Sequence, residues 1–326
     1  MTDQLKTRKA SDFYNGQGII GSSSVDLLSS APSPKKLQHE PSRLMFLRFL
    51  NSALILKSRG HDDRLFDEVL SGDMSELDEA IEYGIASHHD FWRSIGYSLL
   101  ENAVKAELIS VVKLLLKYTN GFNISVKASD LLFFACRQGY LEIAEVLLVH
   151  GADVNKWSTA IDGGNETCLS FACMEGNLDV AKFLLSHGAD PNFACPDGSP
   201  PLVRASGYGN IDIVKFLLEN GADPNLHNSY NEAPLACACS DGYADIAKLL
   251  LDYGADINAH NSEGDTPLMA AFDRSRPDKD LIQLLLDRGA DPSIANTHGK
   301  TALDCVAEGS EYAQMMANAQ LEHILK

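Results

Sequence analysis

One ten-residue phrase recurs five times along this 326-residue chain and constrains its fold more than any other feature. In its clearest copy, Phe216 to Asn225, it reads Phe-Leu-Leu-Glu-Asn-Gly-Ala-Asp-Pro-Asn. The glycines of the five copies are spaced 37, 33, 33 and 35 residues apart, at Gly151, Gly188, Gly221, Gly254 and Gly289. Self-similarity at such a period indicates an array of stacked structural repeats rather than one or two ordinary domains.

Local signals within one period predict two helices. Thr266 is suited to cap a helix N-terminus, and Pro267 fits the first helical position, where no N–H is needed. A second helix is expected around residues 281–286, whose apolar residues cover more than one stripe and so require burial on two sides. Gly289 should end this helix, because glycine adopts the left-handed conformation of a C-terminal cap without steric cost.

Four other segments show the same first helix, each followed by a glycine. They are Pro200-Pro-Leu-Val-Arg-Ala205 with Gly209, Ala233-Pro-Leu-Ala-Cys-Ala238 with Gly242, Thr167-Cys-Leu-Ser-Phe-Ala172 with Gly176, and Asp130-Leu-Leu-Phe-Phe-Ala135 with Gly139. Together with the Gly-Ala-Asp copies, these segments resemble the ankyrin repeat family. The resemblance implies an all-α ankyrin-repeat solenoid of about eight units, including degenerate units at both ends. It also implies partner binding through the turn tips and the first helices.

The chain departs from the family pattern in two ways. The family histidine is replaced in every unit, by Phe133, Ser170, Val203, Ala236, Met269 and Asp304. Because that histidine ties adjacent turns together in the family, its absence puts the rigidity of the turns in doubt. The longer spacings place extra residues between Trp157 and Thr167 and between Asp273 and Asp280. Such insertions either contribute to a binding face or reflect neutral loop variation.

Composition divides the chain into three parts. Residues 1–40 are predicted to be a disordered basic arm, residues 41–60 an apolar helix, and residues 61–326 the array. The formal charge is +5 over residues 1–60 and −23 over the remainder. The first 30 residues lack a compact apolar core behind a basic start, so no secretory signal is expected. The apolar stretch Leu44–Lys57 is too short to span a bilayer, so no membrane span is expected. It is interpreted as a cap on the open end of the array, or else as a helix that docks a partner or lies on a membrane surface.

No recognisable catalytic motif is present. The chain lacks phosphate-binding, nucleophile-elbow and zinc-ligand patterns, so no enzyme, no cofactor and no metal are expected. Cys136, Cys173 and Cys239 follow the repeat and are interpreted as small packing residues, while His150 and His187 should bond to helix-end carbonyls. The recurring Asp of Gly-Ala-Asp should bond to backbone N–H groups in its turn. Seven cysteines without a secretion signal predict reduced thiols in the cytoplasm or nucleus.

Surface residues therefore carry the candidate function. Aromatic residues, Met and Arg are the usual anchors of protein interfaces. The candidate partner-binding residues are Trp157, Phe193, Tyr230 and His260 on the turn tips, and Phe134, Arg137, Phe171, Met174, Arg204 and Tyr208 on the first-helix face. The strongest patch runs from Arg137 to Tyr208, next to the insertion. Replacing Trp157, Arg204 and Tyr208 by alanine is expected to leave helical content and melting unchanged.

These features favour a monomeric, non-enzymatic adaptor, scaffold or inhibitor that holds another protein on the concave face of the solenoid. The acidic body disfavours direct nucleic-acid binding and favours a partner with a basic surface. Two alternatives remain open. One is a bacterial effector that engages host proteins in the host cytosol through the same array. The other is a substrate-receptor subunit of a ubiquitin ligase complex, with Leu44–Lys57 docking the complex.

Overall fold

The computed structural model describes residues 78, 81, 89–117, 125–158, 165–272, 277–307 and 309–325. The chain forms two compact units, residues 1–122 and 123–326, and each is described by itself. The predicted basic arm of residues 1–40, the predicted apolar helix of residues 41–60 and most of the degenerate first repeat lie outside the described residues.

The described part of the first unit is dominated by one helix pair, α5 (His89–Lys105) and α6 (Ile109–Lys117). Leu99 and Val104 of α5 and Val112 of α6 are almost fully buried. The turn between the helices places Glu107 at a φ of +59°, in the left-handed region that the later units occupy with glycine. This pair therefore has the helix–turn–helix form of a repeat, although its turn lacks the usual glycine.

The second unit contains six successive helix pairs among the described residues. Its first helices are α7 (Ser125–Gln138), α9 (Cys168–Glu175), α11 (Pro201–Gly207), α13 (Pro234–Asp241), α15 (Pro267–Ala270) and the 3-10 helix η4 (Ala302–Cys305). Its second helices are α8 (Leu141–Val149), α10 (Leu178–Ser186), α12 (Ile211–Glu219), α14 (Ala244–Asp252), α16 (Lys279–Asp287) and α17 (Glu311–Leu325).

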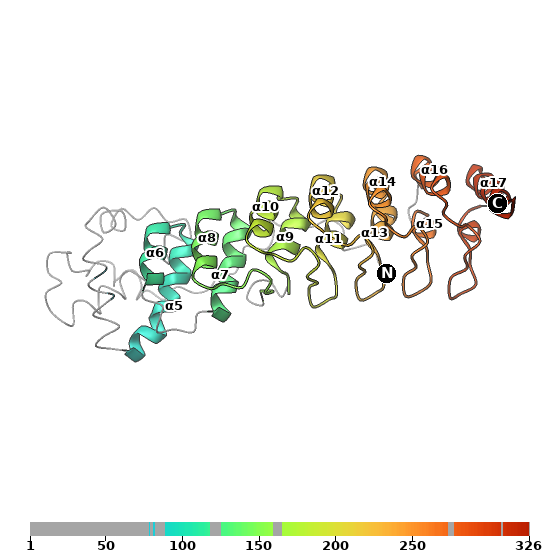
Figure 1. Ribbon diagram of the computed structural model, residues 1–326. Helices are drawn as coiled ribbons and strands as arrows, with labels where there is room; N and C mark the ends of the chain where they lie inside the picture. Colours follow the sequence, from blue (N-terminus) through green and yellow to red (C-terminus); the bar gives the residue numbers. More distant parts are fainter. Residues whose placement is uncertain are drawn as a thin grey trace, which may run out of the picture. The chain divides into compact units, whose positions relative to one another are not determined.

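The helices of this unit form two layers. From α7 to α15 successive first helices pack on one another, and from α10 to α17 successive second helices do the same, so the pairs stack side by side (Figure 1). The loops that join successive pairs project from the first-helix layer as long turns, which we call fingers (Figure 1). The described residues contain no strand, and a single antiparallel bridge joins Ser158 to Glu166. The predicted all-α solenoid of repeats is confirmed.

Threonine side chains cap the start of two first helices. The Thr266 hydroxyl accepts the backbone N–H of Met269 at 3.4 Å, and Pro267 occupies the first turn, which confirms the predicted start of this helix. Thr167 caps α9 in the same way, with the N–H of Ser170 at 3.0 Å. Each cap satisfies an N–H that the helix itself leaves without a partner.

The core lies between the two layers and repeats with the sequence. Five equivalent leucines of the second helices are 0% exposed: Leu147, Leu184, Leu217, Leu250 and Leu285. Burying a leucine stabilises a fold by about 1.5–3 kcal/mol relative to leaving it exposed, so this row is a main source of the stability of the unit. The predicted packing role of Cys136, Cys173 and Cys239 is also confirmed, because all three are buried in the first-helix layer.

An asparagine ladder joins neighbouring fingers where the family histidine is missing. The Oδ1 atom of Asn192 accepts the backbone N–H of Asp223 at 2.8 Å, and its Nδ2 donates to the Gly221 carbonyl at 3.0 Å. Three further asparagines accept the equivalent N–H of the next repeat at 2.7–2.9 Å, namely Asn155, Asn225 and Asn258. The loss of the histidine therefore does not leave the turns unconnected, as the sequence alone had suggested it could.

The last unit begins differently from the others. Asp304 stands where the family has its histidine, and its carboxylate accepts the backbone N–H and the hydroxyl of Thr301 at 2.7 and 2.8 Å. These bonds to the charged form lower the pKa of Asp304 below its ordinary value. The side chain therefore closes the first turn of η4, which is short and 3-10 in form.

All seven cysteines lie within the described residues and carry thiols, but only Cys305 is exposed. Burial raises the pKa of the Cys195 thiol to about 11 and that of Cys237 to about 12. Because the thiolate is the reactive form, a rise of this size lowers the reactive fraction by at least about 100-fold.

We therefore expect iodoacetamide at pH 8 to label Cys305 first in the native protein and to reach all seven cysteines only in denaturant. Peptide mass spectrometry over a time course measures the order of labelling. Early labelling of Cys195 would contradict the packing of its finger.

Candidate functional site

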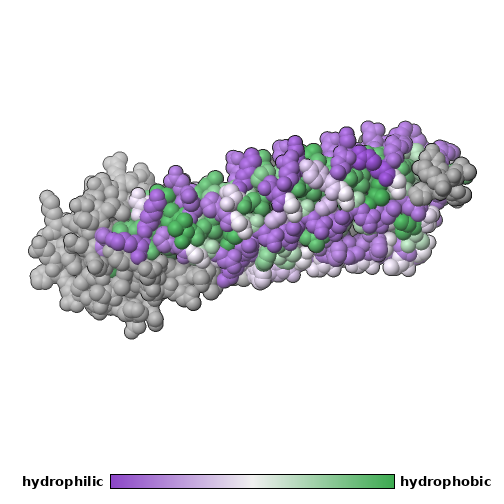
Figure 2. Space-filling view, in the orientation of Figure 1, coloured by the Kyte–Doolittle hydropathy of each residue, from purple (hydrophilic) through white to green (hydrophobic). Residues whose placement is uncertain are grey.

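The structure places all ten candidate partner-binding residues in the second unit, and none of them is buried. The first-helix residues are Phe134 and Arg137 on α7, Phe171 and Met174 on α9, Arg204 on α11 and Tyr208 at its C-terminal end. The finger residues are Trp157, Phe193, Tyr230 and His260. Trp157, Tyr208 and Tyr230 have 39%, 54% and 70% of their surface exposed, so these rings are available for contact. Figure 2 shows one side of the unit, where hydrophobic residues emerge between hydrophilic ones.

Two of the predicted residues meet on the first-helix layer. The guanidinium carbon of Arg137 lies 5.7 Å from the ring centre of Phe171, which is a cation–π distance. Phe133 approaches the same ring edge-on, with 5.4 Å between ring centres. Phe133 was not among the predicted site residues, because it stands at the repeat position of the family histidine. Its buried ring packs against the Phe171 ring that contacts Arg137.

Two other predicted residues meet at the base of neighbouring fingers. The rings of Trp157 and Phe193 are stacked, with centres 6.2 Å apart and planes inclined by 28°. These residues come from successive repeats, and most of the insertion that follows Ser158 lies outside the described residues. Both rings of the pair remain partly exposed.

The finger tips are held in fixed turns. Asn228 accepts the backbone N–H groups of Tyr230 and Glu232 at 2.9 and 3.0 Å, which closes the turn around Tyr230. Ser262 of the next finger donates its N–H and its hydroxyl to the Tyr230 carbonyl at 2.9 and 2.7 Å. Asn231 has a φ of +61° at this tip and donates to the His260 carbonyl. Tyr230 is therefore presented on a turn that is held by its own Asn228 and by the next finger, which reduces the entropy lost on binding.

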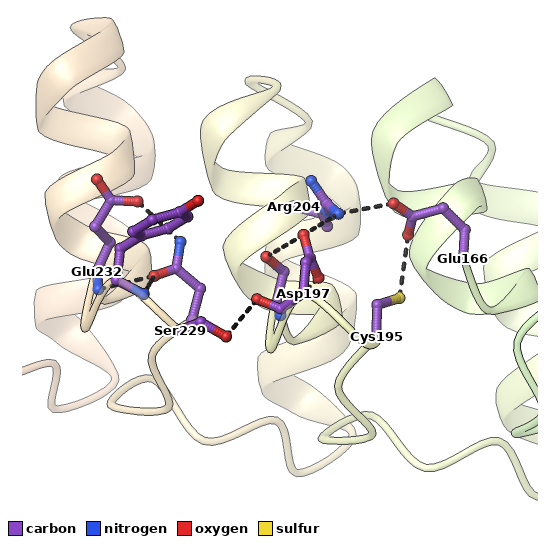
Figure 3. A network of polar contacts seen from close by, with 9 residues as sticks. Glu166, Cys195, Asp197, Arg204, Ser229 and Glu232 are labelled. Atoms are coloured by element: carbon purple, nitrogen blue, oxygen red, sulfur yellow. Dashed lines mark hydrogen bonds and ion pairs between the residues drawn. The ribbon is translucent and has the colours of Figure 1, made fainter. Parts of the chain in front are cut away.

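Arg204 takes part in a network within the protein (Figure 3). Its Nη2 lies 2.7 Å from Glu166 Oε1 and 2.6 Å from Asp197 Oδ2. The other oxygen of Glu166 accepts the Cys195 thiol at 3.1 Å, and Ser199 donates its hydroxyl to Asp197 at 3.0 Å. The network joins the start of α9, one finger and α11, so Arg204 holds these elements together.

This geometry corrects one expectation. Arg204 has 21% of its side chain exposed and is paired with two carboxylates, so its replacement should not leave melting unchanged. Glu166 escaped sequence reasoning because it lies 38 residues before Arg204, at the end of the extended loop. A contact with a partner by the exposed part of Arg204 remains a prediction.

The repeated histidines and aspartates, which could suggest a catalytic or metal site, have structural roles. His150 and His187 donate their Nδ1 protons to the carbonyls of Val146 and Phe183, both at 2.8 Å, which confirms the helix-end prediction. The aspartates of all five Gly-Ala-Asp copies accept a backbone N–H two residues later at 2.8–3.0 Å, as predicted. Within the described ranges, no group of three or more His, Cys, Asp or Glu residues is arranged to hold a metal ion.

The apolar stretch Leu44–Lys57 lies outside the described residues. None of the helices that the structure describes is long and apolar enough to cross a bilayer.

The two helix layers and the recurring fingers define a helical repeat protein. The family model for ankyrin repeats, which spans three copies of the repeat, matches residues 132–228, 169–261, 202–296 and 235–323. These segments cover more than half of the chain, which therefore belongs to the ankyrin repeat family. Ankyrin repeats are generally protein–protein interaction modules. A comparison with curated proteins found no match.

Proposed function

We propose that this protein is a non-enzymatic adaptor, scaffold or inhibitor that binds a partner protein through the first helices and fingers of the middle repeats. The observation that carries the proposal is the grouping of Arg137 with Phe171 and of Trp157 with Phe193. Aromatic and Arg residues dominate the energetics of interfaces, and here they stand on braced elements. The proposal retains the cytoplasmic setting that the cysteine pattern predicts.

The effector and ubiquitin-ligase alternatives use the same surface, so no contact in the described residues favours either of them. They differ in the part taken by residues 44–57, which lie outside the described residues. Deleting residues 41–58 separates the roles of that segment. Unfolding of the array would identify a cap, and loss of one partner from a folded array would identify a docking element.

The surface itself is tested by replacing Trp157 and Tyr208 with alanine. We expect the double variant to keep its helical content and to bind its partner more weakly by more than about 1 kcal/mol, because both rings are exposed. The partner is first identified by crosslinking in native cells, and the purified pair is then measured by calorimetry.

A matched control is Tyr253→Ala together with Val149→Ala, two residues at the C-terminal ends of second helices with 42% and 77% of their surface exposed. Affinity should stay within about twofold in this control. Equal losses in the two double variants would refute the proposed face.

A further inference from the structure

The exposed side of the first-helix layer changes its chemistry along the second unit. At one repeat position the residues are, in order, Phe134, Phe171, Arg204, Cys237 and Ala270. Three residues later in each helix they are Arg137, Met174, Gly207 and Ser240. Large side chains therefore stand on α7 and α9, while small side chains stand on α13 and α15. At these first-helix positions, large apolar side chains stand only on α7 and α9.

Charge changes along the same direction. Residues 125–140, 153–158 and 165–177, the first half, form α7, α9 and the described finger segments beside them and carry four acidic and three basic side chains. Residues 190–210, 223–243, 256–272 and 291–305, the second half, form the later first helices and fingers and carry ten acidic and two basic side chains. The balances are −1 over two repeats and −8 over four. The second half therefore carries more negative charge per repeat and attracts cations more strongly than the first.

Arg204 does not offset this acidity, although it is one of the two basic residues in the second half. Its guanidinium already lies against Glu166 and Asp197, at 2.7 and 2.6 Å. By contrast Glu263 is exposed, and Glu232 and Asp241 are partly exposed. The chemistry of the surface thus changes at α11, whose Arg204 belongs to the network shown in Figure 3.

We infer that the partner presents a bipartite segment, with apolar residues that contact α7 and α9 and a block of Lys or Arg that lies over the fingers and first helices of α13 and α15. This inference rests on the proposed function, because it assigns a chemistry to the partner of that same face. A basic block would complement the negative charge of the later fingers and first helices. An apolar block would contact the partly exposed Phe171 and Met174.

The spacing of the two blocks follows from helix packing. The nearest helices assigned to the two blocks, α9 and α13, are two packing steps apart. Packed helices lie about 8–10 Å apart, so the linker must cross roughly 18 Å. An extended segment covers about 3.3 Å per residue and needs at least about six residues to span that distance. A shorter linker should prevent both blocks from binding together, and the benefit of joining them would then be lost.

Synthetic peptides test the inference on the full-length chain. The main probe joins an apolar Leu-Phe-Met-Leu block to a short Lys block through about eight Gly and Ser residues. Three companions replace the Lys block by Glu, replace the apolar block by Ser, or shorten the spacer to about two residues. By fluorescence anisotropy, each companion should bind more weakly than the main probe by more than about tenfold. Raising NaCl from about 50 to about 300 mM should weaken the main probe most.

Charge-neutral variants locate the basic block. The variant Glu232→Gln, Asp241→Asn and Glu263→Gln removes three charges from the later fingers and α13 while keeping an oxygen acceptor at each position. Its affinity for the main probe should fall by more than about tenfold, with a smaller salt effect. The control Asp212→Asn, Glu219→Gln and Asp245→Asn makes the same charge change on α12 and α14 of the other layer. It should bind within about twofold of the wild type.

The outcomes separate this inference from the proposed function. Equal losses in the two triple variants, or equal binding of all four peptides, would show non-specific attraction and overturn the bipartite assignment. If no peptide binds while the natural partner still depends on Trp157 and Tyr208, the inference fails and the proposed face stands. If the peptides behave as expected but the natural partner ignores both rings, the proposed face fails as the partner site.

Discussion

Replacing Arg204 by leucine should lower the free energy of unfolding of the second unit by about 2–4 kcal/mol. The replacement leaves the carboxylates of Glu166 and Asp197 without the guanidinium that they share. Glu166 has only 15% of its side chain exposed, so water can replace little of the lost interaction. The value lies at or below the usual cost of breaking a buried pair, because Asp197 is 46% exposed and can be solvated.

Chemical denaturation measures this loss, and a second ion pair provides the control. Arg288 and Asp252 are 2.8 Å apart in the other layer, with 34% and 48% of their side chains exposed. Arg288→Leu should therefore cost less than about 1 kcal/mol. Adding Glu166→Gln to Arg204→Leu should restore part of the stability, because it removes the charge that was left unpaired. Similar small losses at Arg204 and Arg288 would mean that the network contributes little.

Replacing Gly264 by alanine should destabilise the unit by about 2–4 kcal/mol, from two causes. Gly264 has a φ of +83°, where a residue with a Cβ is strained by about 1–2 kcal/mol. The added Cβ would also lie 2.9 Å from the backbone nitrogen of Thr297 and 3.0 Å from the Cα of Asn296. Both are backbone atoms of the next finger, so neither can turn aside as a flexible side chain would.

Gly254→Ala separates the two causes. Gly254 has a φ of +87°, but a Cβ there would meet open space. This variant should show only the conformational cost of about 1–2 kcal/mol, and the difference between the two variants in thermal or denaturant unfolding measures the clash. A loss at Gly264 no larger than that at Gly254 would show that the fingers can move apart without cost.

Much of the fold could be predicted because its signals are local. The caps at Thr266 and Gly289 and the aspartate turns depend on residues only a few positions apart, and repetition made each signal visible several times. The asparagine ladder was accessible in principle, since Asn155, Asn192, Asn225 and Asn258 keep the same place in each repeat. Its hydrogen bonds could not be predicted from spacing alone, because they depend on which backbone groups of the next repeat each side chain reaches.

The candidate site could be predicted less completely. Sequence position identified Phe171 and Trp157, but not which ring each would contact, because stacking depends on side-chain directions in neighbouring repeats. Arg204 was expected to be a partner-binding residue whose replacement leaves melting unchanged. Its pairing with Glu166 joins side chains 38 residues apart, and residue spacing does not encode such a contact.

Each hydrogen bond of the asparagine ladder, here called a rung, couples two neighbouring repeats of the second unit. Each rung joins a repeat only to the one that follows, so the loss of a rung weakens one junction and leaves the distant junctions intact. The series stops at Ser293, whose hydroxyl turns back to its own Asp291 at 2.6 Å. The finger before η4 and α17 is therefore held, within this series, by the bond from the Asp291 N–H to Asn258 alone, and loss of that bond would loosen this end of the unit while the other junctions stay closed.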